Sequence, residues 1–236
     1  MSDLNKLYAP GSEGERVIGT YLYPYRIFGE PDWNNPYSAT EVIAKVKVDS
    51  DEVLITHNGG LFIQPPSTLS DGLKPDAEPG KDLQEKLAFQ EKSAYTFNQI
   101  ICEFALTGIV SEPATPVHIS RGVLIDNHAL IMSAGGGREI YLERTIIPSL
   151  QLLQGTWLTH PIHSTDVITA VAKQEVSSQL GLISDNLPTF VASAYSLFSN
   201  HQNSEALIDS WIVIEQIIDW LWKDYLSQIK ERPRGC

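Results

Sequence analysis

An arginine and a histidine separated by six residues, Arg121 and His128, could together act on a phosphodiester. A guanidinium orients a phosphate through paired hydrogen bonds, and an imidazole exchanges protons near neutral pH. Residues 122–127, which separate the two, have the composition of a strand followed by a turn. That composition favours the alternative, in which an exposed turn histidine lies near a surface arginine.

A run of three glycines at 135–137, followed by Arg138, could hold a phosphate through its backbone N–H groups. The segment lacks the Lys-Ser/Thr that completes a P-loop, and it lacks the GxGxxG spacing of a dinucleotide site. We therefore interpret it as a flexible loop.

The histidines are scattered, and only His160 and His163 are close to each other in the sequence. A zinc site would need further Cys, His, Asp or Glu residues at ligand spacing, and none accompanies this pair. The sequence therefore predicts no metal site and no cofactor. The six histidines are His57, His118, His128, His160, His163 and His201.

Glu215 and His118 are the two candidate binding residues. Glu215 falls within an apolar helical pattern, and a carboxylate there needs a partner if it is buried. That partner is either an arginine or lysine from another helix or a ligand. Convergence of these two residues with Arg121 and His128 on one cleft would favour chemistry, whereas dispersal of the four would favour a scaffold.

The elements that must position these residues begin with short strands. An extended segment at 16–23 is followed by alternating apolar and polar residues at 42–49, which predict a half-buried strand. Residues 52–57 and 61–63 continue the extended pattern on either side of an Asn-Gly-Gly turn at 58–60. We predict a β-meander over this region.

A helix and a second group of strands follow a predicted loop at 64–81. Asp82 is a suitable cap for a helix that runs to Phe104 or Leu106, and Gly108 lies where a C-terminal stop is expected. Further strands are predicted at 116–119, 122–125, 129–132 and 139–144, with a turn at 126–128.

The last third of the chain has a helical composition. One helix is predicted over about 167–180 with a cap at Thr165-Asp166, and Pro188 opens a second. The third begins at an N-cap, Ser204, and meets no glycine or proline before Pro233. Its apolar residues recur at steps of four and three and spread beyond one face, so we expect it to pack on more than one side. The stripe consists of Leu207, Trp211, Ile214, Ile218, Leu221 and Tyr225.

Together these patterns predict an α+β protein in which a β-rich part, residues 1–165, precedes an α-helical part, residues 166–236. Of the 236 residues, 42% are hydrophobic and 19% are charged, which is an ordinary globular balance. The net charge of -12 repels phosphate backbones at long range. That charge argues against broad nucleic-acid binding and leaves a local RNA site open.

The cysteines and the apolar segments indicate the cellular compartment of the protein. The two cysteines, Cys102 and Cys236, make no disulfide framework in a chain of this length, so we expect a cytoplasmic protein. The first residues show no basic region leading into an apolar stretch, and no window approaches the roughly 18 apolar residues of a membrane helix. We expect neither a secretory signal nor a membrane span.

Two segments near the C-terminus share a recognisable pattern. Residues 194–198 (AYSLF) and 206–218 (ALIDSWIVIEQII) read as a short helix, a polar break and a long helix in which Trp211 precedes Glu215 by four residues. This pattern resembles the HEPN superfamily, particularly its Apea-like branch. HEPN domains are helical bundles, and many are metal-independent RNases of toxin–antitoxin, CRISPR-linked or anti-phage systems. The resemblance implies such a setting for this chain.

The resemblance carries no catalytic residue over to this sequence. The family motif consists of an arginine, a gap of several residues and a histidine on a later helix. No histidine follows Glu215 here, so Arg232 and Arg234 have no partner for that role. The resemblance therefore implies either a chain that ends before the motif or a non-catalytic branch.

Three functional hypotheses follow, and the sequence leaves open whether the protein is an enzyme. The first is a sensing or binding protein of a bacterial defence or toxin-type system. Its β-rich part would bind a ligand, and its incomplete HEPN-like end would form a homo-oligomer or bind a helical partner protein. The second is a metal-independent RNase that uses Arg121 and His128. The third is a non-enzymatic scaffold or interaction protein.

Overall fold

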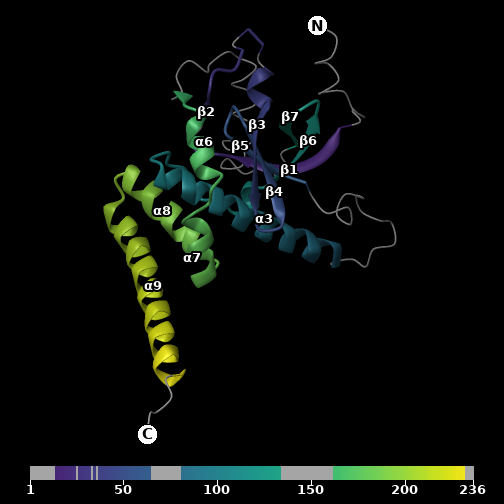
Figure 1. Cartoon of the computed structure of the whole chain (residues 1–236). Helices are drawn as coiled ribbons and strands as arrows, with labels where there is room; N and C mark the ends of the chain where they lie inside the picture. The colour runs from purple at the N-terminus through teal and green to yellow at the C-terminus, as the bar shows by residue number, and fades with distance from the viewer. Residues whose placement is uncertain are drawn as a thin grey trace.

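A computed structural model describes residues 14–24, 26–32, 34–35, 37–64, 81–133 and 162–231. It confirms the α+β class, with an antiparallel sheet formed mainly by the first half of the chain and helices in the second half (Figure 1). The predicted strand at 139–144 and the glycine loop at 135–138 lie outside the described residues.

Six strands form the main sheet, in the order β3-β4-β5-β1-β6-β7, and all neighbours are antiparallel. The β-meander predicted from residue 42 onward is confirmed as β3, β4 and β5. The first strand of the chain, β1, lies between this meander and the β6–β7 hairpin. The strands are β1 (Glu15–Tyr21), β3 (Val42–Val48), β4 (Asp51–Thr56), β5 (Gly60–Ile63), β6 (Ser120–Ile125) and β7 (His128–Ser133).

The two edge strands of this sheet meet at one point. Glu41, just before β3, forms an isolated antiparallel bridge with His128, and the Val42 amide donates to the Asn127 carbonyl at 2.8 Å. Asp126 and Asn127 make the two-residue turn of the hairpin, with φ of 48° and 66°. Positive φ at both positions is the conformation that a tight hairpin requires and that Asp and Asn tolerate. The sheet is therefore curled so that its first and last strands touch.

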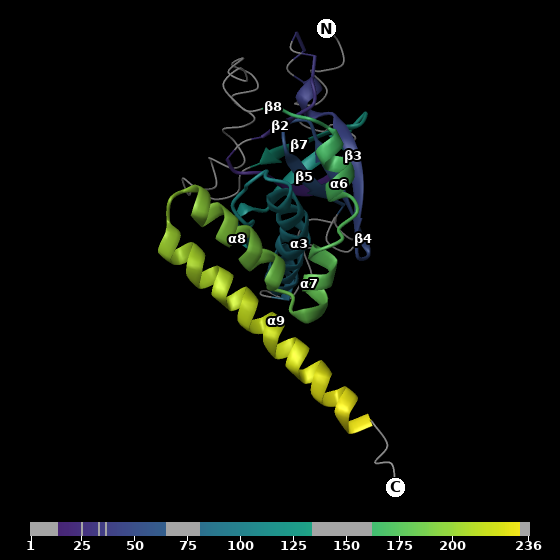
Figure 2. The same cartoon turned by 60° about the vertical axis from the view of Figure 1, so that its left-hand side comes forward.

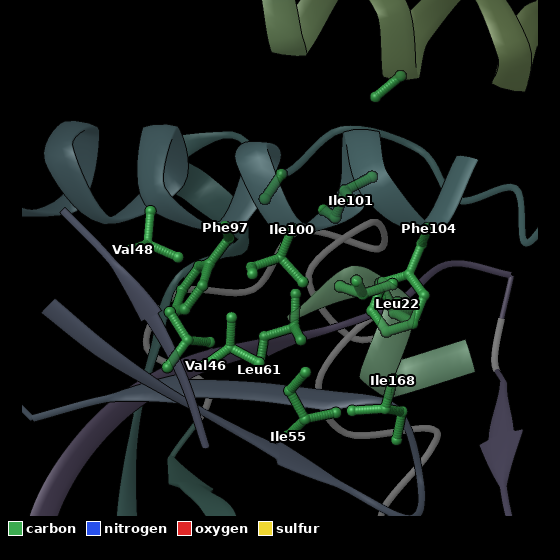
Figure 3. Packing of buried hydrophobic residues seen from close by; sticks show 14 of the residues in the cluster. Leu22, Val46, Val48, Ile55, Leu61, Phe97, Ile100, Ile101, Phe104 and Ile168 are labelled. Atoms are coloured by element: carbon green, nitrogen blue, oxygen red, sulfur yellow. The ribbon is translucent and has the colours of Figure 1, made fainter. Parts of the chain in front are cut away.

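Both faces of the curled sheet are apolar. The inner face holds a buried cluster of Val17, Tyr21, Val42, Leu54, Phe62, Ala129 and Ile131. The outer face is covered by α3 (Lys81–Leu106), and Figure 3 shows Phe97, Ile100 and Phe104 of that helix among residues of the sheet. Burial on both faces explains why β5 is buried at every position rather than at alternate ones.

Helix α3 ends as the sequence predicts. Gly108 has a φ of 88°, and the amides of Gly108 and Ile109 donate to the carbonyls of Ala105 and Phe104 at 3.0 and 2.9 Å. These two bonds form a Schellman motif, in which a glycine adopts the left-handed conformation at low cost.

The predicted strand at 116–119 is wrong. Pro116–His118 instead form a 3-10 turn, η2, because Pro116 stands at its start and Thr115 caps it. The His118 Nδ1 accepts a hydrogen bond from the Thr115 amide at 3.1 Å, which closes the turn. Local side-chain bonds of this kind compete with strand pairing.

A single helix over 167–180 is also wrong, because two short helices, α6 (Asp166–Val171) and α7 (Ser177–Ile183), occupy this region. Gln174 interrupts them with a φ of 49°, and its side-chain amide donates to the Lys47 carbonyl at 2.8 Å. Thr165 makes no side-chain cap, whereas the Ser164 hydroxyl accepts from the Asp166 amide at 3.1 Å. A tertiary hydrogen bond to the sheet thus accompanies the break.

The last two helices are α8 (Leu187–Ser199), which Pro188 opens as predicted, and α9 (Asn203–Glu231), which starts one residue before Ser204. They pack together as a hairpin, and α8 also packs on α3.

Two short elements complete the fold: a parallel pair of β2 (Ile27–Phe28) with β8 (Ile162–His163), and a 3-10 turn, η1 (Ser38–Thr40). None of the helices in the described ranges has the length and apolar character needed to cross a membrane.

Glu103 joins α3, the helix that covers the sheet, to α7 of the helical part. Its carboxylate accepts the backbone amides of Val176 and Ser177 at 3.0 and 2.7 Å, at the start of α7, and the residue is only 6% exposed. A carboxylate at a helix N-terminus satisfies free amides and interacts favourably with the helix dipole.

We expect Glu103→Ala to lower the free energy of unfolding by about 2–4 kcal/mol, because it leaves two amides without an acceptor. Urea denaturation followed by circular dichroism measures this change. Glu91→Ala, at an exposed position of the same helix, is the matched control and should change stability by less than about 0.5 kcal/mol. Equal stability of the two variants would contradict the capping role.

Candidate functional site

Arg121 and His128 lie on neighbouring strands but at opposite ends of their hairpin. Arg121 pairs with Ser133, whereas His128 pairs with Ile125 beside the turn. His128 is opposite Ile125, which lies four residues after Arg121 on β6, so the two backbone positions are about 13 Å apart along the strand. Arg121 is exposed, and His128 is partly buried. The two side chains therefore arise from opposite ends of the hairpin.

His128 has a structural environment. Its Nδ1 lies 3.1 Å from the Tyr37 carbonyl oxygen and 3.2 Å from the Thr40 hydroxyl. A carbonyl can only accept, so the Nδ1–H donates to Tyr37. This contact joins η1 to the start of β7, where the two edges of the sheet meet.

The other two candidates lie elsewhere. His118 is buried in the η2 turn beside α3, and Glu215 is exposed on α9. The four predicted residues thus lie on four different elements, β6, β7, η2 and α9. The described part of the chain has no group of three or more His, Cys, Asp and Glu residues that could hold a metal ion. His160, Arg138, Arg232 and Arg234 lie outside the described residues.

An open depression of about 320 Å³ lies beside the β3–β4 turn. Its polar lining includes three carboxylates, Glu15, Asp51 and Glu52, and one lysine, Lys45. Lys45 already pairs with Glu52 at 3.4 Å, and Asp51 pairs with Lys92 at 2.9 Å. The depression is acidic and exposed, which makes it a poor site for an anion such as RNA.

A second group of polar residues gathers around β2 and β8. Phe28 lies between two histidines: its carbonyl accepts from the His57 Nδ1, and its ring is 5.9 Å from the His163 ring. The amide of Gly29 donates to the His163 carbonyl at 2.7 Å. Arg26 comes one residue before β2, and one of its Nη atoms donates to the Val110 carbonyl at 2.9 Å. The β2–β8 pair thus brings together residues more than 130 positions apart in the sequence.

Two nitrogens of this group have no hydrogen-bond partner among the described residues, the Arg26 Nε and the His163 Nε2, and both are shielded from solvent. Burial lowers the pKa of both side chains, and the charge of Arg26 lowers the pKa of His163 further. The ion pairs of the described residues do not include Arg26. A buried donor without an acceptor costs about 1–3 kcal/mol, and a small oxyanion placed here would supply acceptors and negative charge. We name this group, Arg26, His57 and His163, the β2–β8 polar cluster.

The sequence reasoning missed this cluster. His57 and His163 are 106 positions apart in the sequence, and no local pattern links either of them to Arg26. Its position before a strand of two residues gives no pattern that could reveal a pairing with β8.

The largest exposed apolar feature lies on α9. Of the 19 exposed large hydrophobic residues in the described part of the chain, 11 belong to this helix. They are Leu207, Ile208, Trp211, Ile214, Ile218, Trp220, Leu221, Trp222, Tyr225, Leu226 and Ile229. Trp220 lies about 160° around the helix from Ile218 and so belongs to another side, and we call the other ten residues the α9 apolar face. It includes every residue of the predicted stripe.

The expectation that α9 packs on more than one side fails within the single chain. Val213 and Ile217 pack against the cluster formed by Cys102, Leu180 and Leu187, whereas the predicted stripe points away from it. Figures 1 and 2 show the C-terminal half of α9 extending beyond the rest of the molecule, and residues 218–229 are all exposed.

No protein-family model, no curated protein and no solved structure matches this chain.

Inorganic phosphate is the probe for the β2–β8 polar cluster. We expect it to shift the NMR signals of the His163 ring saturably at constant ionic strength, because it can accept from the Arg26 Nε–H, whose charge acts on that ring. Arg26→Gln should weaken that response about tenfold or more, as expected for loss of a charge-assisted hydrogen bond. Arg16→Gln removes the same charge from an exposed position on β1 and should leave the response unchanged. A response that is absent, or equal in the two variants, would eliminate the cluster as an anion site.

Proposed function

We propose that the protein is a non-enzymatic binding protein that works as a self-associated assembly held together through the α9 apolar face. The observation that carries this proposal is the exposure of that face: Trp211 is 63% exposed and Ile218 59%. Monomeric proteins rarely leave a continuous apolar patch of this extent in water. The dispersal of the four candidate catalytic and binding residues supports an interaction role over a catalytic one.

The size of the face suits a second protein chain. Aromatic side chains each offer about 150–250 Å², so the three aromatic residues of the face, Trp211, Trp222 and Tyr225, roughly half exposed, contribute about 300 Å². A stable interface buries about 800 Å² on each partner. The seven aliphatic residues of the face can supply the remainder. Covering the face with a copy of itself therefore reaches the area that a stable dimer needs.

The resemblance to HEPN domains falls on the same part of the chain. Residues 194–198 lie on α8 and residues 206–218 on α9, the two helices that pack together as a hairpin. This resemblance is the support for a bacterial defence or toxin-type setting. The β2–β8 polar cluster is a place where the β-rich part of such a protein could bind its ligand.

Replacing one residue of the face by a charged one tests the self-association. We expect Ile218→Glu to weaken it by about tenfold or more, because burial of an unpaired carboxylate opposes association. Analytical ultracentrifugation separates the 26.2 kDa monomer from the dimer. Leu182→Glu is the matched control, because Leu182 is 84% exposed on α7 and lies off the face. A wild-type protein that is monomeric at high micromolar concentration would refute the proposal.

The metal-independent RNase remains the second hypothesis, and its test is a cleavage assay without added metal. We expect the wild type and His128→Ala to leave a structured RNA equally intact, because Arg121 and His128 lie at opposite ends of their hairpin and the His128 Nδ1 donates to the Tyr37 carbonyl. Cleavage by the wild type that is lost in His128→Ala would restore the enzyme hypothesis. The folded state of the variant is checked by circular dichroism, because His128 also joins the edges of the sheet.

A further inference from the structure

The apolar residues on α9 are arranged symmetrically about Ile218. Apolar side chains lie 4, 7 and 11 positions before it and 4, 7 and 11 positions after it. Each of these residues is large and exposed. The pairs at equal distance are Ile214 with Trp222, Trp211 with Tyr225, and Leu207 with Ile229.

This spacing places all seven residues on one side of the helix. Steps of four and three residues return to nearly the same face of an α-helix, as in the seam of a coiled coil. The residues that pack on the protein's own core, Val213 and Ile217, lie on another side. The seam extends from Leu207 to Ile229, a separation of 22 positions or about 33 Å of helix.

We propose that two copies of this chain pair through antiparallel α9 helices, with the two-fold axis passing beside Ile218. This inference rests on the proposed self-association and adds its geometry. About that axis, each apolar residue lies opposite an apolar residue: Ile218 meets its own copy, and Trp211 meets the Tyr225 position of the second copy. A two-fold interface requires such self-complementarity, because the same patch must serve both copies.

The charges on α9 favour the antiparallel direction. Residues 203–219 carry four acids and no base, and the bases of the helix, Lys223 and Lys230, follow them. A parallel pair would place the two acidic halves side by side, where like charges repel. The antiparallel pair instead places the Lys230 position at the level of Ala206 of the second copy, one residue from Glu205. The four acids are Glu205, Asp209, Glu215 and Asp219.

The position of the body of the protein favours the same direction. The sheet and α3 lie near the N-terminal half of α9, and the C-terminal half extends freely (Figure 2). In an antiparallel pair, each free half lies along the half that carries the body of the second copy. A parallel pair would bring both bodies to the same end of the seam.

A cysteine on a two-fold axis can form a disulfide with its own copy, which gives a direct test. We expect Ile218→Cys, in a Cys236→Ser background, to become a covalent dimer on mild oxidation, as seen on a non-reducing gel. Leu207→Cys in the same background should stay monomeric on the gel, because its copy lies about 33 Å away along the seam. The native Cys102 does not interfere, because burial raises its pKa to about 12.

Spin labels at the same two positions supply the second measurement. Electron–electron distances between copies should be short for a label at 218 and about 33 Å for a label at 207. A distance near 10 Å at both positions would establish parallel helices and overturn the proposal. A dimer with long distances at both positions would overturn the register. A monomeric wild type in ultracentrifugation would instead refute the self-association itself.

Discussion

The fold depends on the burial of α3 between two layers. One side of this helix covers the outer face of the curled sheet, and the other side receives α7 and α8. Polar groups fix the second layer: the Asn98 side chain donates to the Ala114 carbonyl and the Thr189 hydroxyl, and Glu103 caps α7. A helix buried on two sides must pair every polar group that it carries inward, because an unpaired one costs more than a bond gains.

Local patterns in the sequence were sufficient for much of this fold. Alternation at 42–48, the Asp-Asn turn of the second hairpin, Gly108 after α3 and Pro188 before α8 each report a backbone preference of the residues themselves. The errors have the opposite origin. The break at Gln174 accompanies a hydrogen bond to Lys47, and the meeting of Glu41 with His128 joins residues 87 positions apart. No local pattern encodes such contacts.

The candidate sites show the same division. Period and composition were sufficient to find the apolar stripe on α9, but a periodic stripe does not say whether the chain itself covers it. Val213 and Ile217, which do pack inward, belong to a different face of the same helix. Arg26 and His163 could not be found at all, because a strand of two residues has no period, and their proximity comes from the β2–β8 pairing.

The proposed association through α9 must overcome the charge of the protein. Two chains that each carry a net charge of -12 repel each other, and apolar burial at the seam has to exceed that repulsion. Exposed charges interact weakly beyond about 8–10 Å at physiological ionic strength. A seam of about 33 Å with the bodies at opposite ends separates most of the acidic residues by more than that distance. The antiparallel direction therefore combines self-complementary apolar contacts with the smallest repulsion between the two bodies.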